Sequence, residues 1–82
     1  MFVTYILWSK SLGKFYTGQS VDLNRRLTEH NRGKTAFMKA GIPWLLVFSK
    51  ECNSRNEAVK LERVIKKRGA ARFLSDNFIS FG

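Results

Sequence analysis

Five side chains in this 82-residue chain are of types that can bind and cleave a phosphodiester. They are Tyr5, Tyr16, Arg26, His30 and Glu62. An arginine fork can stabilise the charge that develops on a phosphoryl group, and a phenol or an imidazole can act as a general acid or base. A carboxylate is the ligand type that suits Mg²⁺. If the fold brings these groups together, they predict a phosphodiesterase site.

Residues 23–31 have the pattern of a short amphipathic helix that carries Arg26 and His30. Two leucines form its apolar stripe, and the four-residue spacing places Arg26 and His30 on one face at the edge of the core. Held there, Arg26 can present its donors to a phosphate. Two alternatives remain open at this point: Arg26 pairs with Asp22, or His30 is a helix-end residue bonded to a nearby carbonyl.

A second helix is predicted over residues 55–68, after the capping box formed by Ser54 and Glu57. Its apolar stripe contains Ala58, Leu61, Val64 and Ile65. Glu62 projects within about 40° of the buried side of this helix, and a buried carboxylate needs a partner. That partner is either a magnesium ion, which takes one or two protein carboxylates, or Lys66 in an ordinary i,i+4 ion pair.

The two tyrosines fall in a predicted β-hairpin. Residues 2–9 are an apolar run typical of a strand covered on both faces, and residues 14–18 return antiparallel to it. Gly18, at the end of the second strand, lets a ligand or another part of the chain approach closely. The alternative for Tyr5 and Tyr16 is a core ring with its hydroxyl at the surface.

The remaining elements complete a single domain over residues 1–82. A basic loop over 32–43 leads to a third strand at 44–48, and a short last helix is expected over 70–77. The order β-β-α-β-α-α predicts an α+β fold with a small three-stranded antiparallel sheet flanked by helices. A chain of this length forms one modest core.

The formal net charge of +9 predicts a polyanionic partner, of which nucleic acid is the commonest. The residues expected to contact it are Gly18, Arg25, Arg32, Lys34, Lys39, Lys66 and Lys67. For the cluster at Lys66 and Lys67, the alternative is a solvated helix end. DNA is the expected ligand, with RNA left open.

Several other classes of protein are excluded by composition. The single cysteine, Cys52, forms no internal disulfide and fits a reducing compartment, so we expect the cytoplasm. One histidine and one cysteine cannot build a zinc site, and the chain has no phosphate-binding glycine loop. No apolar run reaches the length of a membrane span, and the N-terminus reads as a strand rather than a signal peptide.

Taken in order, these residues resemble the GIY-YIG nuclease superfamily, in particular small stand-alone members similar to the catalytic module of the bacterial excision-repair nicking subunit. Residues 3–5 stand at the first signature tripeptide and residues 16–18 at the second. Arg26 matches the essential arginine, His30 a position where a tyrosine or histidine assists, and Glu62 the metal-ligand glutamate. The first tripeptide keeps only its tyrosine, and Gln19 replaces a lysine that some members use to activate the second tyrosine.

The resemblance implies a metal-dependent DNA endonuclease that leaves 5′-phosphate and 3′-hydroxyl ends. Tyr16 would activate the attacking water with help from Tyr5 and His30, Arg26 would stabilise the phosphate, and Glu62 would hold one Mg²⁺ or Mn²⁺ ion. Two other interpretations are compatible with the sequence: a basic nucleic-acid-binding module without catalysis, and a nuclease domain that needs a partner protein for targeting.

Overall fold

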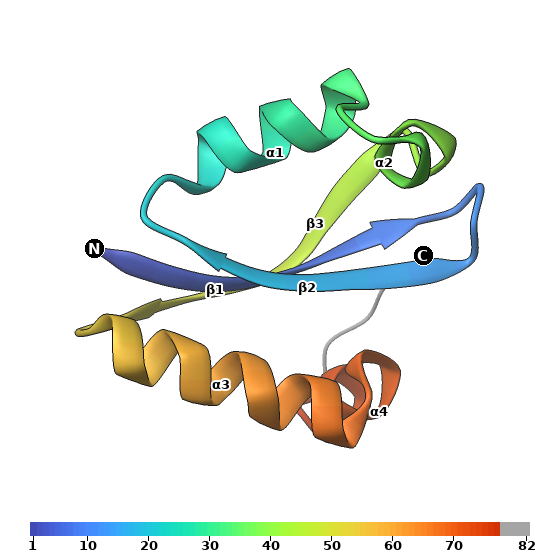
Figure 1. Ribbon diagram of the computed structural model, residues 1–82. Helices are drawn as coiled ribbons and strands as arrows, with labels where there is room; N and C mark the ends of the chain where they lie inside the picture. The colour runs from blue at the N-terminus through green and yellow to red at the C-terminus, as the bar shows by residue number, and fades with distance from the viewer. Residues whose placement is uncertain (78–82) are drawn as a thin grey trace.

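The protein is built on a three-stranded antiparallel sheet, seen in a computed structural model that describes residues 1–77 (Figure 1). The strands are β1 (Phe2–Ser9), β2 (Lys14–Ser20) and β3 (Trp44–Cys52), in the spatial order β2-β1-β3. The apolar N-terminal strand is therefore central, and β2 lies at an edge. The predicted fold class and the predicted hairpin are confirmed.

Helices cover both faces of the sheet (Figure 1). The pair α1 (Leu23–Arg32) and α2 (Ala36–Ala40) lies on one face, and the pair α3 (Arg55–Arg68) and α4 (Ala70–Asp76) lies on the other. Within residues 1–77, no helix is both long and apolar enough to cross a bilayer.

Two boundaries differ from the prediction. The expected loop over 32–43 contains α2, whose first turn is capped by Thr35 through a 3.2 Å bond from the Met38 amide. Strand β3 runs on to Cys52 rather than ending at residue 48, because its polar second half continues to pair with β1. A five-residue helix and a polar half-strand both lack the periodicity that identifies such elements from sequence.

The core has one layer on each side of β1. Tyr5 and Leu7 point toward α1, where they pack with Trp44, and Ile6 points toward α3, where it packs with Ile65. The alternation of β1 therefore fills both layers, as expected for a strand covered on both faces. The predicted apolar stripe of α3 is wrong at one position, since Val64 is 55% exposed.

Side-chain caps fix the start of each helix that carries a candidate residue. The Asp22 carboxylate accepts a 3.0 Å hydrogen bond from the Arg25 amide at the start of α1. At the start of α3, Ser54 Oγ accepts one from the Glu57 amide at 3.2 Å, and Glu57 reaches back to the Asn53 amide at 2.9 Å. The predicted capping box of Ser54 and Glu57 therefore forms, and the two caps set the point at which each helix begins.

Candidate active site

The two tyrosines lie side by side on the α1 face of the hairpin. Tyr5 pairs directly with Gly18 across the strands, and its ring stacks near that of Tyr16 with centroids 6.4 Å apart. A Cβ placed on Gly18 would lie 2.8 Å from the Tyr5 hydroxyl and 3.2 Å from Tyr16 Cε1. The close approach expected at Gly18 is thus made by Tyr5 itself, and contact of Gly18 with nucleic acid stays a prediction.

His30 is enclosed by aromatic rings rather than placed at the edge of the core, where we expected it. It is 1% exposed, and its ring centroid lies 4.6 Å from that of Tyr16 and 6.0 Å from that of Trp44. Nδ1 lies 2.9 Å from the Arg26 carbonyl oxygen, and since a carbonyl only accepts, Nδ1 must donate. The neutral ring then carries a lone pair on Nε2. Within residues 1–77, Nε2 is buried and has no hydrogen-bond partner.

The pKa of Tyr5 depends on its burial and on charged groups of both α1 and α3. Burial raises the pKa of the Tyr5 phenol to about 12, and the neighbouring Tyr16 adds to this. The Arg26 guanidinium on α1 lowers the same pKa, whereas the Glu62 carboxylate on α3 raises it. At neutral pH this phenol keeps its proton, so it can donate a hydrogen bond and does not act as a base.

Arg26 extends from α1 with its guanidinium free. The alternative in which it pairs with Asp22 is not seen, because the Asp22 carboxylate caps the helix instead. No carboxylate within residues 1–77 forms an ion pair with Arg26. Its side chain lines two adjoining hollows of about 220 Å³ and 210 Å³. An exposed, unpaired guanidinium beside open space can bind a phosphate oxygen.

Glu62 is half-buried, with 21% of its side chain exposed, so the prediction of a buried carboxylate is wrong. Its Oε2 lies 2.7 Å from Lys66 Nζ, as the i,i+4 alternative predicted. No group of three or more metal-ligating side chains occurs in the part of the chain that the structure describes. A single carboxylate still fits Mg²⁺, which often fills its shell with water and substrate phosphate oxygens. Glu62 can serve in this way once Lys66 moves aside.

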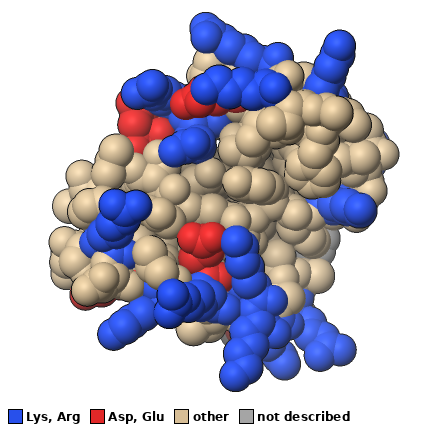
Figure 2. Space-filling model, in the orientation of Figure 1, with Lys and Arg blue, Asp and Glu red and all other residues tan. Residues whose placement is uncertain are grey.

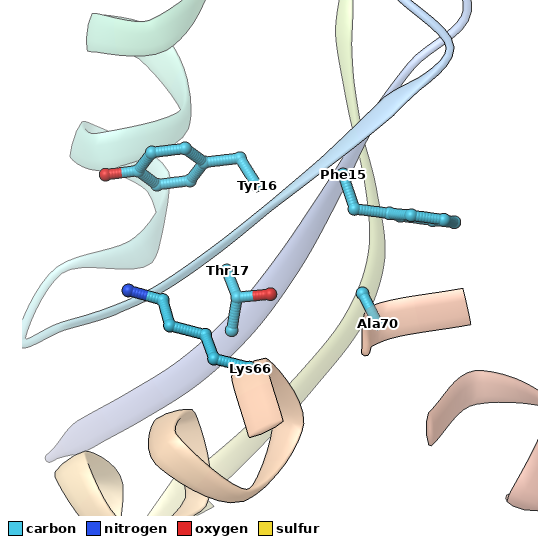
Figure 3. Close-up of a pocket in the computed structure, with 5 residues that line it drawn as sticks. All are labelled: Phe15, Tyr16, Thr17, Lys66 and Ala70. Atoms are coloured by element: carbon cyan, nitrogen blue, oxygen red, sulfur yellow. The ribbon is translucent and has the colours of Figure 1, made fainter. Parts of the chain in front are cut away.

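The charged groups border the edge of β2. Figure 2 shows Lys and Arg gathered over α1 and over α3, with a largely uncharged band between them. On the α3 side, a hollow of about 380 Å³ is lined by Phe15, Tyr16, Thr17, Lys66 and Ala70 (Figure 3). In this view Tyr16 points toward α1, while Lys66 reaches up from α3 beside the strand. Lys66 therefore lies next to both Glu62 and the strand that carries Tyr16.

Residues 1–73 match the family model of the GIY-YIG catalytic domain, and this stretch contains all five candidate catalytic residues. The chain belongs to the GIY-YIG family. The resemblance seen in the sequence is confirmed, and the catalytic roles of Tyr5, Tyr16, Arg26, His30 and Glu62 stay predictions.

The GIY-YIG chain is similar to several curated bacterial proteins. A UPF0213 protein of Streptococcus agalactiae is 40% identical over 57 residues, which cover 68% of this chain and 65% of the relative. One of Streptococcus pneumoniae is 35% identical over 69 residues, covering 79% and 70%, and one of Yersinia enterocolitica is 44% identical over 64 residues, covering 77% and 65%. The chain thus spans about two thirds of the length of these relatives. No solved structure matches it.

The residues predicted to contact nucleic acid do not all line the three hollows of this GIY-YIG domain. Arg25 lines the hollow of about 220 Å³, and Lys66 lines the one at Phe15. The others line none of the three hollows: Lys34 pairs with Glu29 at 2.8 Å, Arg32 ends α1, Lys39 lies in α2, and Lys67 is exposed on α3. Their contact with nucleic acid stays a prediction.

Two residues of the site were missed in the sequence. Trp44 packs edge-on against the rings of His30 and Tyr16. The Asn31 side chain holds Trp44 in place, because its Oδ1 accepts a 2.7 Å hydrogen bond from the Trp44 backbone amide. Arg55 lines the same hollow as Arg26, although nearly thirty positions separate them in the chain. Neither residue belongs to a spacing pattern, so only the tertiary structure places them at the site.

Proposed function

We propose that this GIY-YIG domain is a divalent-metal-dependent endonuclease that hydrolyses DNA phosphodiester bonds, acting in the processing or repair of structured DNA. The observation that carries the proposal is that the stacked Tyr5 and Tyr16 rings lie against His30 of α1, the helix that carries the unpaired Arg26, while Lys66, the partner of Glu62, lines the same hollow as Tyr16. A cation for the phosphate and a ligand for a metal are thus held around one pair of phenols. The net charge of +9 supports a polyanionic substrate.

In the proposed reaction, a water oxygen forms a bond to phosphorus and the bond from phosphorus to the 3′ oxygen breaks. Tyr16 orients the water and takes its proton, His30 packs against the Tyr16 ring and assists it, and the leaving 3′ oxygen takes a proton from solvent. The protonated Tyr5 phenol donates a hydrogen bond within the site. Arg26 stabilises the charge that develops on the phosphoryl oxygens.

Glu62 is the residue proposed to hold the one Mg²⁺ or Mn²⁺ ion. When bound, such an ion supplies Lewis acidity toward the phosphate and the leaving oxygen. Lys66, at 2.7 Å from Glu62, is then free to pair with a backbone phosphate. The buried free thiol of Cys52 fits the cytoplasm, where we propose the protein acts.

The test is an endonuclease assay on nicked, flapped, branched and plain duplex DNA, with and without Mg²⁺. We expect metal-dependent cleavage that falls by at least about a hundredfold in Arg26→Ala and in Glu62→Ala, as for other losses of a preorganised electrostatic group. Arg63→Ala is the matched control, because Arg63 is an exposed arginine of α3 that lines none of the three hollows. Unchanged cleavage in either variant, with the fold intact by circular dichroism, would remove the proposal.

The rival function is nucleic-acid binding without chemistry, and the Glu62–Lys66 ion pair is the observation that favours it, since it occupies the only carboxylate proposed for the metal. Both functions predict salt-sensitive binding, but only the nuclease predicts a product. Repeating the assay with cell extract added tests whether a partner protein is needed for targeting. Cleavage that appears only with extract would assign the catalytic module to a larger assembly.

A further inference from the structure

We propose that Arg55 and Gln19, together with Arg26, form a second phosphate subsite that binds the nucleic-acid backbone beside the scissile phosphate. This inference rests on the proposed function, because it names where the rest of the substrate strand lies. It assigns a role to two residues that belong to none of the catalytic positions.

The subsite is the hollow of about 210 Å³ at the end of β2. It is lined by Phe2, Gln19, Ser20, Val21, Arg26 and Arg55. Arg26 comes from α1 and Arg55 from the first residue of α3, so the two guanidinium groups reach the hollow from helices on opposite faces of the sheet. No carboxylate lines this hollow.

Within residues 1–77 neither arginine is held by an ion pair, although Asp22 and Glu29 line the adjoining hollow beside Arg26. Both arginines are exposed. By contrast, Arg25 and Lys34 pair with Glu29, and Lys66 pairs with Glu62. Two like charges that face one hollow with no carboxylate in its lining repel each other, and an anion between them relieves the repulsion. A backbone phosphate is the anion that a nuclease brings.

The position of Gln19 supports the same ligand. Side chains alternate along β2, so Tyr16 and Gly18 face α1 while Gln19 faces α3 and the hollow of Arg55. Gln19 therefore points away from the face that holds the phenol it would need to activate. Its amide N–H groups can instead donate to a phosphate oxygen, a common contact to nucleic-acid backbones.

The geometry also places the subsite relative to the chemistry. Tyr16 and Gln19 are three residues apart on β2, a distance of about 10 Å along a strand. A nucleotide strand in B-form DNA rises about 3.4 Å per nucleotide, so the subsite engages a phosphate within about three nucleotides of the cleaved bond. Arg26, which lines the hollow and also acts on Tyr5, links the two positions.

The test measures the coupling between Arg55 and one defined phosphate. Branched duplex oligonucleotides carry a single methylphosphonate, which removes one phosphate charge, at each position within four nucleotides of the branch point and, where cleavage is seen, of the cleaved bond. Binding to the whole chain is measured by fluorescence anisotropy in EDTA, so that no cleavage occurs. The proteins are the wild type, Arg55→Gln, and Arg63→Gln as a matched control, because Arg63 is another exposed arginine of α3 that lines none of these hollows.

We expect Arg55→Gln to weaken binding about three- to tenfold. The logarithm of the binding constant should also fall less steeply with the logarithm of the salt concentration, with a slope about one smaller in magnitude. One methylphosphonate within three nucleotides should weaken the wild type by a similar factor and have no further effect on Arg55→Gln. For Arg63→Gln, the loss of affinity from the substitution and the loss from the methylphosphonate should multiply at every position. The subsite would be overturned if Arg55→Gln and the methylphosphonate weakened binding independently at every position. It would also be overturned if Arg63→Gln were coupled to a methylphosphonate as strongly as Arg55→Gln.

The outcome also separates the two proposals. Cleavage in Mg²⁺ without coupling at Arg55 overturns the subsite and leaves the nuclease standing. Coupling at Arg55 without any cleavage keeps the phosphate contact but overturns its place beside a cleaved bond, and leaves a binding module.

Discussion

Replacing Gly18 with alanine tests whether the two tyrosines are held at a fixed position. The added Cβ would lie 2.8 Å from the Tyr5 hydroxyl, 3.0 Å from Tyr5 Cζ and 3.2 Å from Tyr16 Cε1. Since ordinary contact begins near 3.4 Å, the Tyr5 hydroxyl must withdraw by about 0.6 Å, the difference between 3.4 and 2.8 Å. Tyr5 is 2% exposed and packs against Leu7 and Trp44, so it has little room to move.

Two opposing effects decide the sign of the change in stability. A glycine-to-alanine replacement at an unstrained position stabilises a protein by about 0.4–1 kcal/mol, because it restricts the unfolded chain. Overpacking a filled core costs about 1–3 kcal/mol. The clash is with a buried ring, so we expect net destabilisation of about 1–2 kcal/mol. A displacement of 1 Å at a catalytic group can cost about a hundredfold in rate, so a shift of about 0.6 Å predicts a loss of about tenfold.

The assays are urea unfolding followed by circular dichroism, and single-turnover cleavage in Mg²⁺. The double variant Gly18→Ala with Tyr5→Phe is the internal control, because it removes the atom at 2.8 Å and should recover part of the lost stability. A Gly18→Ala protein that is more stable than the wild type and cleaves at the same rate would refute the packing argument, as would two substitutions whose effects on stability simply add.

Three further predictions follow from the same contacts. Because the pKa of Tyr5 is raised, the stability that its protonated phenol contributes is complete below pH 10 and is lost as the pH rises from 10 toward 12. Tyr5→Phe should therefore remove about 1.4 kcal/mol of lost stability per pH unit in this range, measured by urea unfolding, and an unchanged dependence of stability on pH would contradict the raised pKa. His30→Phe removes the buried unpartnered Nε2 together with the Nδ1 bond to the Arg26 carbonyl, and because these two effects on stability oppose each other, the unfolding temperature should change little while cleavage falls at least tenfold. Equal cleavage would remove His30 from the mechanism. Lys66→Met frees Glu62, so Mn²⁺ affinity measured by calorimetry without DNA should rise about three- to tenfold, whereas Lys67→Met, which removes an equal charge next to it, should change it less.

The elements with strong local signals were predictable from the sequence. The apolar run of β1, the Asp22 and Ser54 caps and the glycine stops at Gly33 and Gly69 define the hairpin and both long helices before any tertiary contact is considered. Helix α2 was not predictable because it has only five residues. The second half of β3 was not predictable because it is polar and its strand conformation depends on pairing with β1.

The site was predictable in its residue types and not in its environments. Periodicity placed Arg26 and His30 on one face of α1, but full burial of His30 depends on Trp44, which arrives from β3. Periodicity also overstated the burial of Glu62, because that carboxylate lies where α3 meets the open edge of the sheet and pairs with Lys66. The approach of Arg55 to Arg26 depends on two helices meeting at the end of β2, which no local pattern encodes.

The central claim is that Arg26 and Glu62 act on one phosphate, and a double-mutant cycle in single-turnover cleavage tests it most directly. Groups that stabilise one transition state as a unit are strongly non-additive. We predict that the variant carrying both Arg26→Ala and Glu62→Gln cleaves no more than about tenfold slower than the slower single variant, with the fold retained. Rate losses that multiply in full would place the two residues in independent roles and contradict the shared site.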